Sequence, residues 1–168
     1  DGSPEITSVQ GAVIHHTVTA NDYAASQVPA ILRSIQAYHM DGRGWSDIGY
    51  NFLVDRFGTI WEGRQGGIEL PIRGVHASEA NSVSTGISVI GRHDVAAVPT
   101  ATRNAVTRLV AWKLAIHSVP VGATFTLNGV RMTNVIGHRN VPTAQTACPG
   151  TYLYNLLPTI RAGAASLQ

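Results

Sequence analysis

An α/β fold, with one domain built on a central mixed β-sheet flanked by α-helices, is predicted by three features of the sequence. Short apolar runs of strand length alternate along the chain with long amphipathic stretches. The spacings between these runs are irregular, which favours a mixed sheet over a doubly wound parallel one. The chain has 168 residues, of which 44% are hydrophobic. This length suits one core, so we expect a single domain over residues 1–168.

The N-terminal third predicts one strand and one helix. Residues 11–17, GAVIHHT, have the pattern of a buried strand that ends in polar residues. Asn21 or Asp22 is a suitable N-cap for a helix that runs to about His39. Five apolar side chains of this helix follow the 3–4 spacing of a core-facing stripe, namely Val28, Ile31, Leu32, Ile35 and Tyr38.

The middle of the chain predicts a hairpin and a further strand. Residues 50–55 and 59–62 read as strands on either side of a turn at Arg56-Phe57-Gly58. Residues 86–91, GISVIG, form another short apolar strand. Together with the first strand, these segments supply the predicted sheet.

The C-terminal half predicts two helices around one more strand. Pro99 and Thr100 introduce an amphipathic helix with an apolar face formed by Val106, Leu109, Val110 and Leu114. Residues 133–137 read as a strand that leads into His138. Residues 152–164 read as a final helix that Pro158 disturbs.

Composition excludes some classes of function and suggests others. The net charge is only +2 and the basic residues are scattered, so we expect no nucleic-acid partner. No apolar stretch is long enough to span a membrane, and we expect a monomer. Eleven of the 12 basic residues are Arg, a bias that suggests a GC-rich bacterial genome. The chain begins at Asp1 without a signal peptide, so we expect a mature or excised piece of a larger secreted protein.

Three segments carry side chains suited to metal chemistry: VIHHT with His15, GHR with His138, and TACPG with Cys148. Imidazole and thiolate are common ligands of zinc, and three protein ligands leave the fourth tetrahedral position open, as in catalytic sites. The spacing by itself is a weak signal. On residue types alone, a hydrogen-bonded loop histidine and a packed thiol are the simpler interpretations of His138 and Cys148.

Strand geometry restricts the first of these segments. Consecutive side chains of a strand face opposite sides of the sheet. We therefore expect at most one of His15 and His16 to face a given site, with the other packed or hydrogen-bonded behind it.

Four motifs in fixed order carry a family resemblance: VIHHT, HMDGRGWSDIGYNFLVDRFGTIWEGR, GVHASEANSVSTGISVIG and GHRNVPTAQTACPG. Over residues 11–160 the chain resembles the type 2 N-acetylmuramoyl-L-alanine amidases, a family that includes phage endolysins and animal peptidoglycan recognition proteins. The resemblance implies the peptidoglycan recognition protein-like amidase fold. It also implies zinc-dependent hydrolysis of the amide bond between N-acetylmuramic acid and L-alanine of peptidoglycan or muropeptides, in an extracellular or cell-wall location.

Site residues follow from the resemblance, position by position. It makes His15, His138 and Cys148 the ligands of one Zn²⁺ per chain. It makes Tyr50 the active-site tyrosine and Thr146 a second catalytic hydroxyl. The resemblance also implies a substrate-binding role for three further residues, His39, Arg43 and His76.

Two loops depart from the family pattern. The interval between His138 and Cys148 is two residues longer than in close relatives, so residues 142–145 are expected to form a longer loop. The stretch 65–74, before His76, is also longer. The first departure affects the position of Thr146 and the second affects that of His76.

Three other functions compete with a zinc amidase. A module that binds peptidoglycan without cutting it shares the same fold, but members that have lost zinc typically lack the residue matching Cys148. A cysteine hydrolase with a Cys148–His138 pair would need an exposed thiol of low pKa. A structural zinc site would need a fourth protein ligand, and the sequence offers no candidate.

Overall fold

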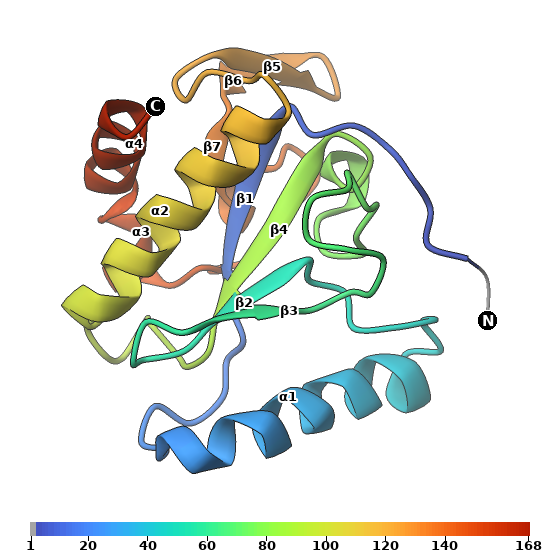
Figure 1. The fold of residues 1–168 in the computed structure, drawn as a ribbon, viewed down its shortest axis with the longest axis vertical. Helices are drawn as coiled ribbons and strands as arrows, with labels where there is room; N and C mark the ends of the chain where they lie inside the picture. Colours follow the sequence, from blue (N-terminus) through green and yellow to red (C-terminus); the bar gives the residue numbers. More distant parts are fainter. Residues whose placement is uncertain (1–2) are drawn as a thin grey trace.

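The computed structural model describes residues 3–168, and its centre is a five-stranded sheet with the order β3-β2-β4-β1-β7 (Figure 1). Four strands are parallel: β1 (Gly11–His16), β2 (Phe52–Val54), β4 (Ser84–Val89) and β7 (Val135–Gly137). The edge strand β3 (Ile60–Glu62) runs antiparallel to β2. The predicted mixed sheet and the predicted hairpin are therefore confirmed.

One face of the sheet is covered by α2 (Thr100–Ile116) and α4 (Leu157–Ser166), which pack against each other (Figure 1). The strands contribute the alternate residues Ile14, Ile87 and Val135 to this core. The apolar face predicted for the second helix packs onto them through Val106, Leu109, Val110 and Leu114. Side chains of the same strands that lie between these positions consequently point to the other face.

The other face is partly covered by α1 (Val28–Ala37), which packs over β2 (Figure 1). Val28 and Ile35 contact this smaller core, which also contains Leu53. Tyr38 does not join it: its side chain is 57% exposed, so the predicted apolar stripe is wrong at its last position. The reason is a π-helical turn at Tyr38–Gly42, which changes the helical period where α1 ends.

The start of this helix also differs from the prediction. Neither Asn21 nor Asp22 caps it, because α1 begins at Val28, after a 3₁₀ turn at Ala25–Gln27 and with Pro29 in its first turn. Asn21 instead binds the loop after β4: its side chain accepts a hydrogen bond from the backbone N–H of Arg92 and donates one to the carbonyl of that residue.

A hairpin that the sequence analysis missed lies beside the sheet. It consists of β5 (Thr124–Leu127) and β6 (Val130–Thr133), joined at Asn128-Gly129. Both turn residues have positive φ, 46° and 79°, as a two-residue type I′ turn requires. The strand predicted at 133–137 is consequently two segments, since β6 ends at Thr133 and β7 begins at Val135.

The C-terminal helix is divided, as Pro158 suggested. A short helix, α3 (Thr151–Tyr154), is followed by two turn residues and then by α4, with Pro158 in its first turn. Short 3₁₀ turns also occur at Ser78–Ala80 and His138–Asn140. No helix within residues 3–168 is long and apolar enough to cross a bilayer.

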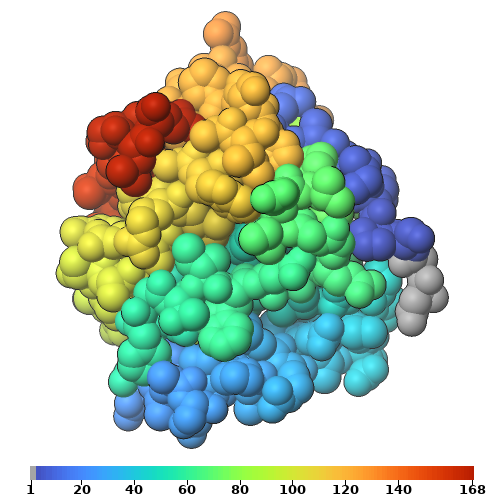
Figure 2. All heavy atoms as spheres, in the orientation of Figure 1, coloured from blue at the N-terminus to red at the C-terminus, as the bar shows by residue number. Residues whose placement is uncertain are grey.

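The long loop between β3 and β4 lies on the surface between α2 and the N-terminal segment (Figure 2, bright green). Lys113 of α2 holds it by donating to the carbonyls of Ile68 and Leu70, at 2.7 and 2.8 Å. The N-terminal segment pairs with its other side through an isolated bridge between Ile6 and Ile72. This loop leads directly to His76.

Candidate metal centre and the groove around it

Two of the predicted zinc ligands meet at the carboxyl edge of the sheet. β1 and β7 are adjacent parallel strands in which Ile14 pairs with Gly137. His15, near the end of β1, and His138, just after β7, therefore lie side by side at this edge of the sheet. Their ring centroids are 4.7 Å apart.

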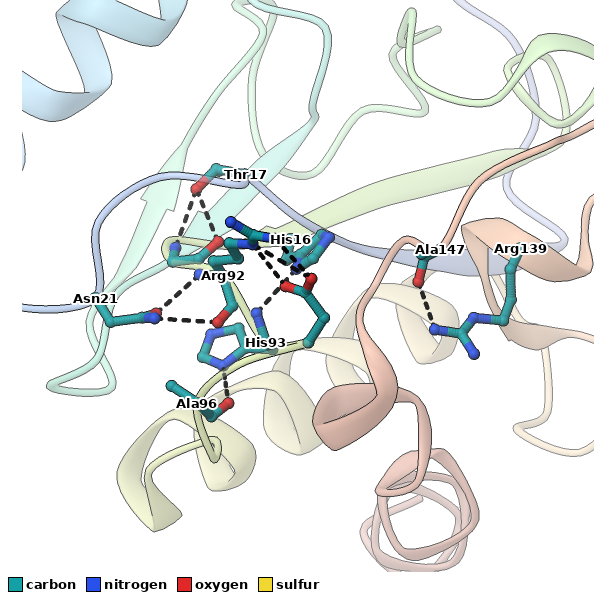
Figure 3. Close-up of polar contacts among 10 residues, drawn as sticks. His16, Thr17, Asn21, Arg92, His93, Ala96, Arg139 and Ala147 are labelled. Atoms are coloured by element: carbon teal, nitrogen blue, oxygen red, sulfur yellow. Dashed lines mark hydrogen bonds and ion pairs between the residues drawn. The ribbon is translucent and has the colours of Figure 1, made fainter.

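Cys148 is brought to this pair by the return of loop 138–148. The backbone N–H of Arg139 donates to the carbonyl of Cys148 at 2.9 Å, and its guanidinium donates to the carbonyl of Ala147 (Figure 3). The guanidinium also lies 4.4 Å from the ring centroid of Tyr154. These contacts close loop 138–148 while keeping the thiol beside the imidazoles.

The three side chains fit a zinc ion. One potential ligand atom from each of His15, His138 and Cys148 lies within 4.8 Å of the others. The Nδ1 atom of His15 is 3.6 Å from Sγ of Cys148. Nitrogen and sulfur bound to one tetrahedral zinc, at about 2.1 and about 2.3 Å, are separated by about 3.6 Å.

Burial also favours the ligand form of both imidazoles. It lowers the pKa of His15 well below its ordinary value, with further lowering by His76, His138 and His16. Burial likewise lowers the pKa of His138. Both rings are therefore neutral near pH 7, and a neutral imidazole is the form that binds a metal.

His16 points away from this cluster, as the strand alternation predicted. Its Nδ1 accepts the backbone N–H of His93 at 3.0 Å, on the other side of the strand (Figure 3). The His93 ring is buried and lies 3.0 Å, through Nδ1, from the carbonyl oxygen of Ala96. These two histidines join the end of β1 to the loop that follows β4.

The thiol does not resemble that of a cysteine hydrolase. Cys148 is only 8% exposed, and burial raises the pKa of its thiol to about 12. A catalytic nucleophile needs an accessible sulfur with a lowered pKa. A structural zinc site is not favoured either, because the cluster has three members and no fourth ligand among residues 3–168.

A groove of about 750 Å³ opens above the three candidate ligands. No carboxylate lines its walls within the described part of the chain. Its lining includes all eight residues predicted for the site, which come from five separate segments: His15, His39, Arg43, Tyr50, His76, His138, Thr146 and Cys148.

The two predicted catalytic hydroxyls lie beside different members of the cluster. Tyr50, just before β2, has its ring centroid 5.3 Å from that of His15. Burial raises the pKa of Tyr50 to about 12, and Cys148 adds to this shift, so the phenol keeps its proton. Thr146 is exposed, and its Oγ1 accepts the backbone N–H of Cys148 at 3.1 Å. This bond leaves the hydroxyl proton of Thr146 free to donate.

The three predicted substrate-binding residues have different surroundings. His39 is buried, and its Nδ1 accepts the backbone N–H of Gly49 at 2.9 Å, so it supports the turn before Tyr50. Arg43 is exposed, with its guanidinium 5.6 Å from the ring centroid of Tyr38 and 5.2 Å from that of Trp45. His76 contacts His15: the Nδ1 atom of His76 lies 2.9 Å from Nε2 of His15.

Several groove residues were not identified from the sequence. Tyr38 was assigned to the core, yet it lines the groove, as does Trp45. The π-helical turn directs Tyr38 outward, and no sequence pattern announces such a turn. Val18 and Asn81 also line the groove, and the sequence gave no signal for them beyond their proximity to His15 and His76.

Comparison with known proteins identifies the family of this chain. The profile of the N-acetylmuramoyl-L-alanine amidase family matches residues 5–151. Peptidoglycan-recognition protein SC2 of Drosophila melanogaster is 37% identical over 150 residues, which cover 88% of this chain and 72% of that protein. This relative is an insect protein, so the bacterial source suggested by the Arg bias stays a prediction.

Two solved structures share the fold. Peptidoglycan recognition protein-LE, in complex with tracheal cytotoxin, has a TM-score of 0.77 at 28% identity, over 94% of this chain and 85% of that one. N-acetylmuramoyl-L-alanine amidase LysC from Clostridium intestinale has a TM-score of 0.70 at 25% identity, over 93% and 85%. The chain therefore belongs to the N-acetylmuramoyl-L-alanine amidase family, together with the peptidoglycan recognition proteins.

Proposed function

We propose that this chain is a zinc-dependent amidase that hydrolyses the amide bond between N-acetylmuramic acid and L-alanine of peptidoglycan. The observation that carries the proposal is the cluster of His15, His138 and Cys148 at the base of an open groove. A set of two imidazoles and one thiolate that leaves one tetrahedral position open is typical of catalytic zinc.

The groove also contains groups that can act on the substrate amide together with a zinc ion. A zinc ion held by the three ligands would supply Lewis acidity for the amide carbonyl and lower the pKa of a water molecule. Tyr50 keeps its proton and donates a hydrogen bond to the oxygen on which negative charge develops. The hydroxyl of Thr146, held by the N–H of Cys148, is a second donor for that oxygen.

Substrate is held by groups farther along the groove. The guanidinium of Arg43 is suited to a stem-peptide carboxylate, with which it can form two parallel hydrogen bonds. Muropeptides or polymeric peptidoglycan are the proposed partners, and peptidoglycan recognition protein-LE has been solved with such a fragment. This substrate implies an extracellular or cell-wall location. We propose that the chain acts as a monomer without nucleic acid.

Recognition without cleavage is the second candidate, because the most similar relatives include proteins named for recognition. Both candidates use the same groove, and they differ only in what happens to the bound amide. The presence of all three candidate zinc ligands favours the enzyme.

The dependence of peptidoglycan hydrolysis on zinc distinguishes an amidase from a protein that only recognises peptidoglycan. Purified protein treated with a chelator and dialysed is expected to lose hydrolysis of a peptidoglycan suspension, and added Zn²⁺ is expected to restore it. Cys148→Ser should bind much less zinc by elemental analysis and stay inactive after zinc is added. Activity that survives complete zinc removal would exclude a zinc amidase. A zinc-loaded protein that binds peptidoglycan without releasing peptides would instead support recognition.

A further inference from the structure

His15 has polar contacts at both of its ring nitrogens. Nδ1 lies 3.6 Å from Sγ of Cys148, and Nε2 lies 2.9 Å from Nδ1 of His76. A metal shared with Cys148 takes Nδ1, so the proton of the neutral His15 ring must reside on Nε2. That proton needs an acceptor, and Nδ1 of His76 is the atom in position.

His76 is poorly placed to contact a substrate through its other nitrogen. The ring lines the groove, but its Nε2 atom is buried and has no hydrogen-bond partner among residues 3–168. The contact with His15 is thus the one side-chain hydrogen bond of the imidazole in this part of the molecule.

The fold also fixes the position of this ring. Oδ1 of Asn81 accepts the backbone N–H groups of His76 and Ala77, each at 2.8 Å. On β4, Gly86 leaves room for the imidazole, because a Cβ atom there would lie 2.5 Å from it. Backbone and ring are therefore held in place where the His15 contact is made.

We propose that His76 is a positioning residue that accepts the Nε2–H of His15 and thereby presents Nδ1 of His15 to zinc. Metal-binding histidines commonly donate their second ring N–H to a carboxylate, a carbonyl or a water molecule, which fixes the tautomer and ring orientation. In this protein the buried neutral imidazole of His76 accepts that hydrogen bond. The inference rests on the proposed zinc site and replaces direct substrate contact as the role of His76.

A matched pair of substitutions tests the proposed positioning role of His76. In His76→Asn the side-chain oxygen lies near the former place of Nδ1 and can accept the same hydrogen bond. His76→Leu has similar bulk but no acceptor. Measured by competition with a chromophoric chelator, His76→Leu is expected to bind zinc about 10–100-fold more weakly than the wild type. His76→Asn is expected to regain most of that affinity, and both should keep the wild-type KM for a soluble muropeptide once saturated with zinc.

Two outcomes would overturn the proposal. In the first, both variants bind zinc like the wild type. In the second, both raise KM equally with zinc affinity intact, as a substrate contact would require. Cys148→Ser and His138→Ala serve as references in the same assay. If they too retain zinc, the ligand set and the proposed function fail; if they lose zinc while His76→Leu does not, only the role of His76 fails.

A measurement on the wild-type protein avoids any folding defect of the variants. ¹⁵N NMR of the zinc-loaded protein, with the His15 ring assigned, reports which nitrogen carries the proton. The proposal predicts protonated Nε2 with a hydrogen bond to nitrogen and zinc-bound Nδ1. A His15 ring protonated at Nδ1 would overturn it.

Discussion

At the scale of single residues, Tyr50 offers the clearest separation of chemistry from metal binding. Its phenol stays protonated because burial raises its pKa to about 12, and its ring lies beside that of His15. Tyr50→Phe keeps the ring and removes only the donor. We expect kcat on a soluble muropeptide to fall by about 10²–10³-fold, as for the loss of one oxyanion donor, with zinc content unchanged.

Tyr152→Phe is the matched control, since Tyr152 is 50% exposed and does not line the groove. It should retain wild-type turnover. Full activity in Tyr50→Phe would mean that the hydroxyl does not reach the reacting carbonyl. Loss of zinc in the same variant would assign the effect to the metal centre instead.

Substitutions of Arg43 test substrate binding rather than turnover. Its guanidinium lies near the rings of Tyr38 and Trp45 and faces the groove. A carboxylate held there is bound equally in the ground state and the transition state, so Arg43→Ala should raise KM with little change in kcat. Arg43→Lys should not restore KM, because an ammonium group cannot form two parallel hydrogen bonds.

Steady-state kinetics on one soluble muropeptide decides between the alternatives. An unchanged KM in Arg43→Ala would make Arg43 an ordinary surface residue. A collapse of kcat with KM intact would contradict a pure binding role and place the side chain at the reacting bond.

The position of a side chain can be predicted from the sequence when a short stretch of chain determines it, and not when distant segments must come together. The opposite directions of His15 and His16 follow from strand alternation alone, and the structure confirms them. The meeting of His15, His138 and Cys148 follows from strand order and loop closure, which no single segment encodes. Only the family resemblance linked these three positions before the fold was known.

At the scale of elements, Lys113 joins α2 to the long loop before His76. Its ammonium donates to two loop carbonyls, and burial lowers its pKa from the ordinary 10.5 to about 8. Between these two values the unfolded chain binds more protons than the folded one. The free energy of unfolding should therefore gain a positive dependence on pH from this group.

Urea unfolding of the wild type and Lys113→Met from about pH 7.5 to about pH 9.5 measures this contribution. Lys113→Met should be less stable at every pH, because two loop carbonyls lose their donor. The stability difference in favour of the wild type should widen as pH rises through the window. Parallel pH profiles for the two proteins would contradict a lowered pKa at Lys113.

Elements were predictable where the sequence pattern is regular and local. The mixed sheet, the β2–β3 hairpin, α2 and the break near Pro158 follow from apolar periodicity and from proline chemistry. The β5–β6 hairpin was readable from its Asn128-Gly129 turn but was overlooked. The π-helical end of α1 was not readable, because no sequence pattern announces such a turn.

At the scale of the whole molecule, the order of the parallel strands brings the candidate metal ligands together. Adjacent β1 and β7 end at the same edge of the sheet, and loop 138–148 adds the thiol there. The wall with Arg43 and Tyr38 comes from the end of α1, on the face opposite α2. The candidate ligands and the proposed substrate wall thus belong to different parts of the fold, so we expect binding variants and metal variants to have separate effects.

The bond that we propose is cut is the amide between N-acetylmuramic acid and L-alanine, and mass spectrometry of digested peptidoglycan tests this most directly. The zinc-loaded protein should release stem peptides with a free L-alanine amino terminus and leave the glycan strands at full length. Cys148→Ser should release none. Shortened glycans, cleaved cross-links with the stem peptides still attached, or an intact polymer would each contradict the amidase account.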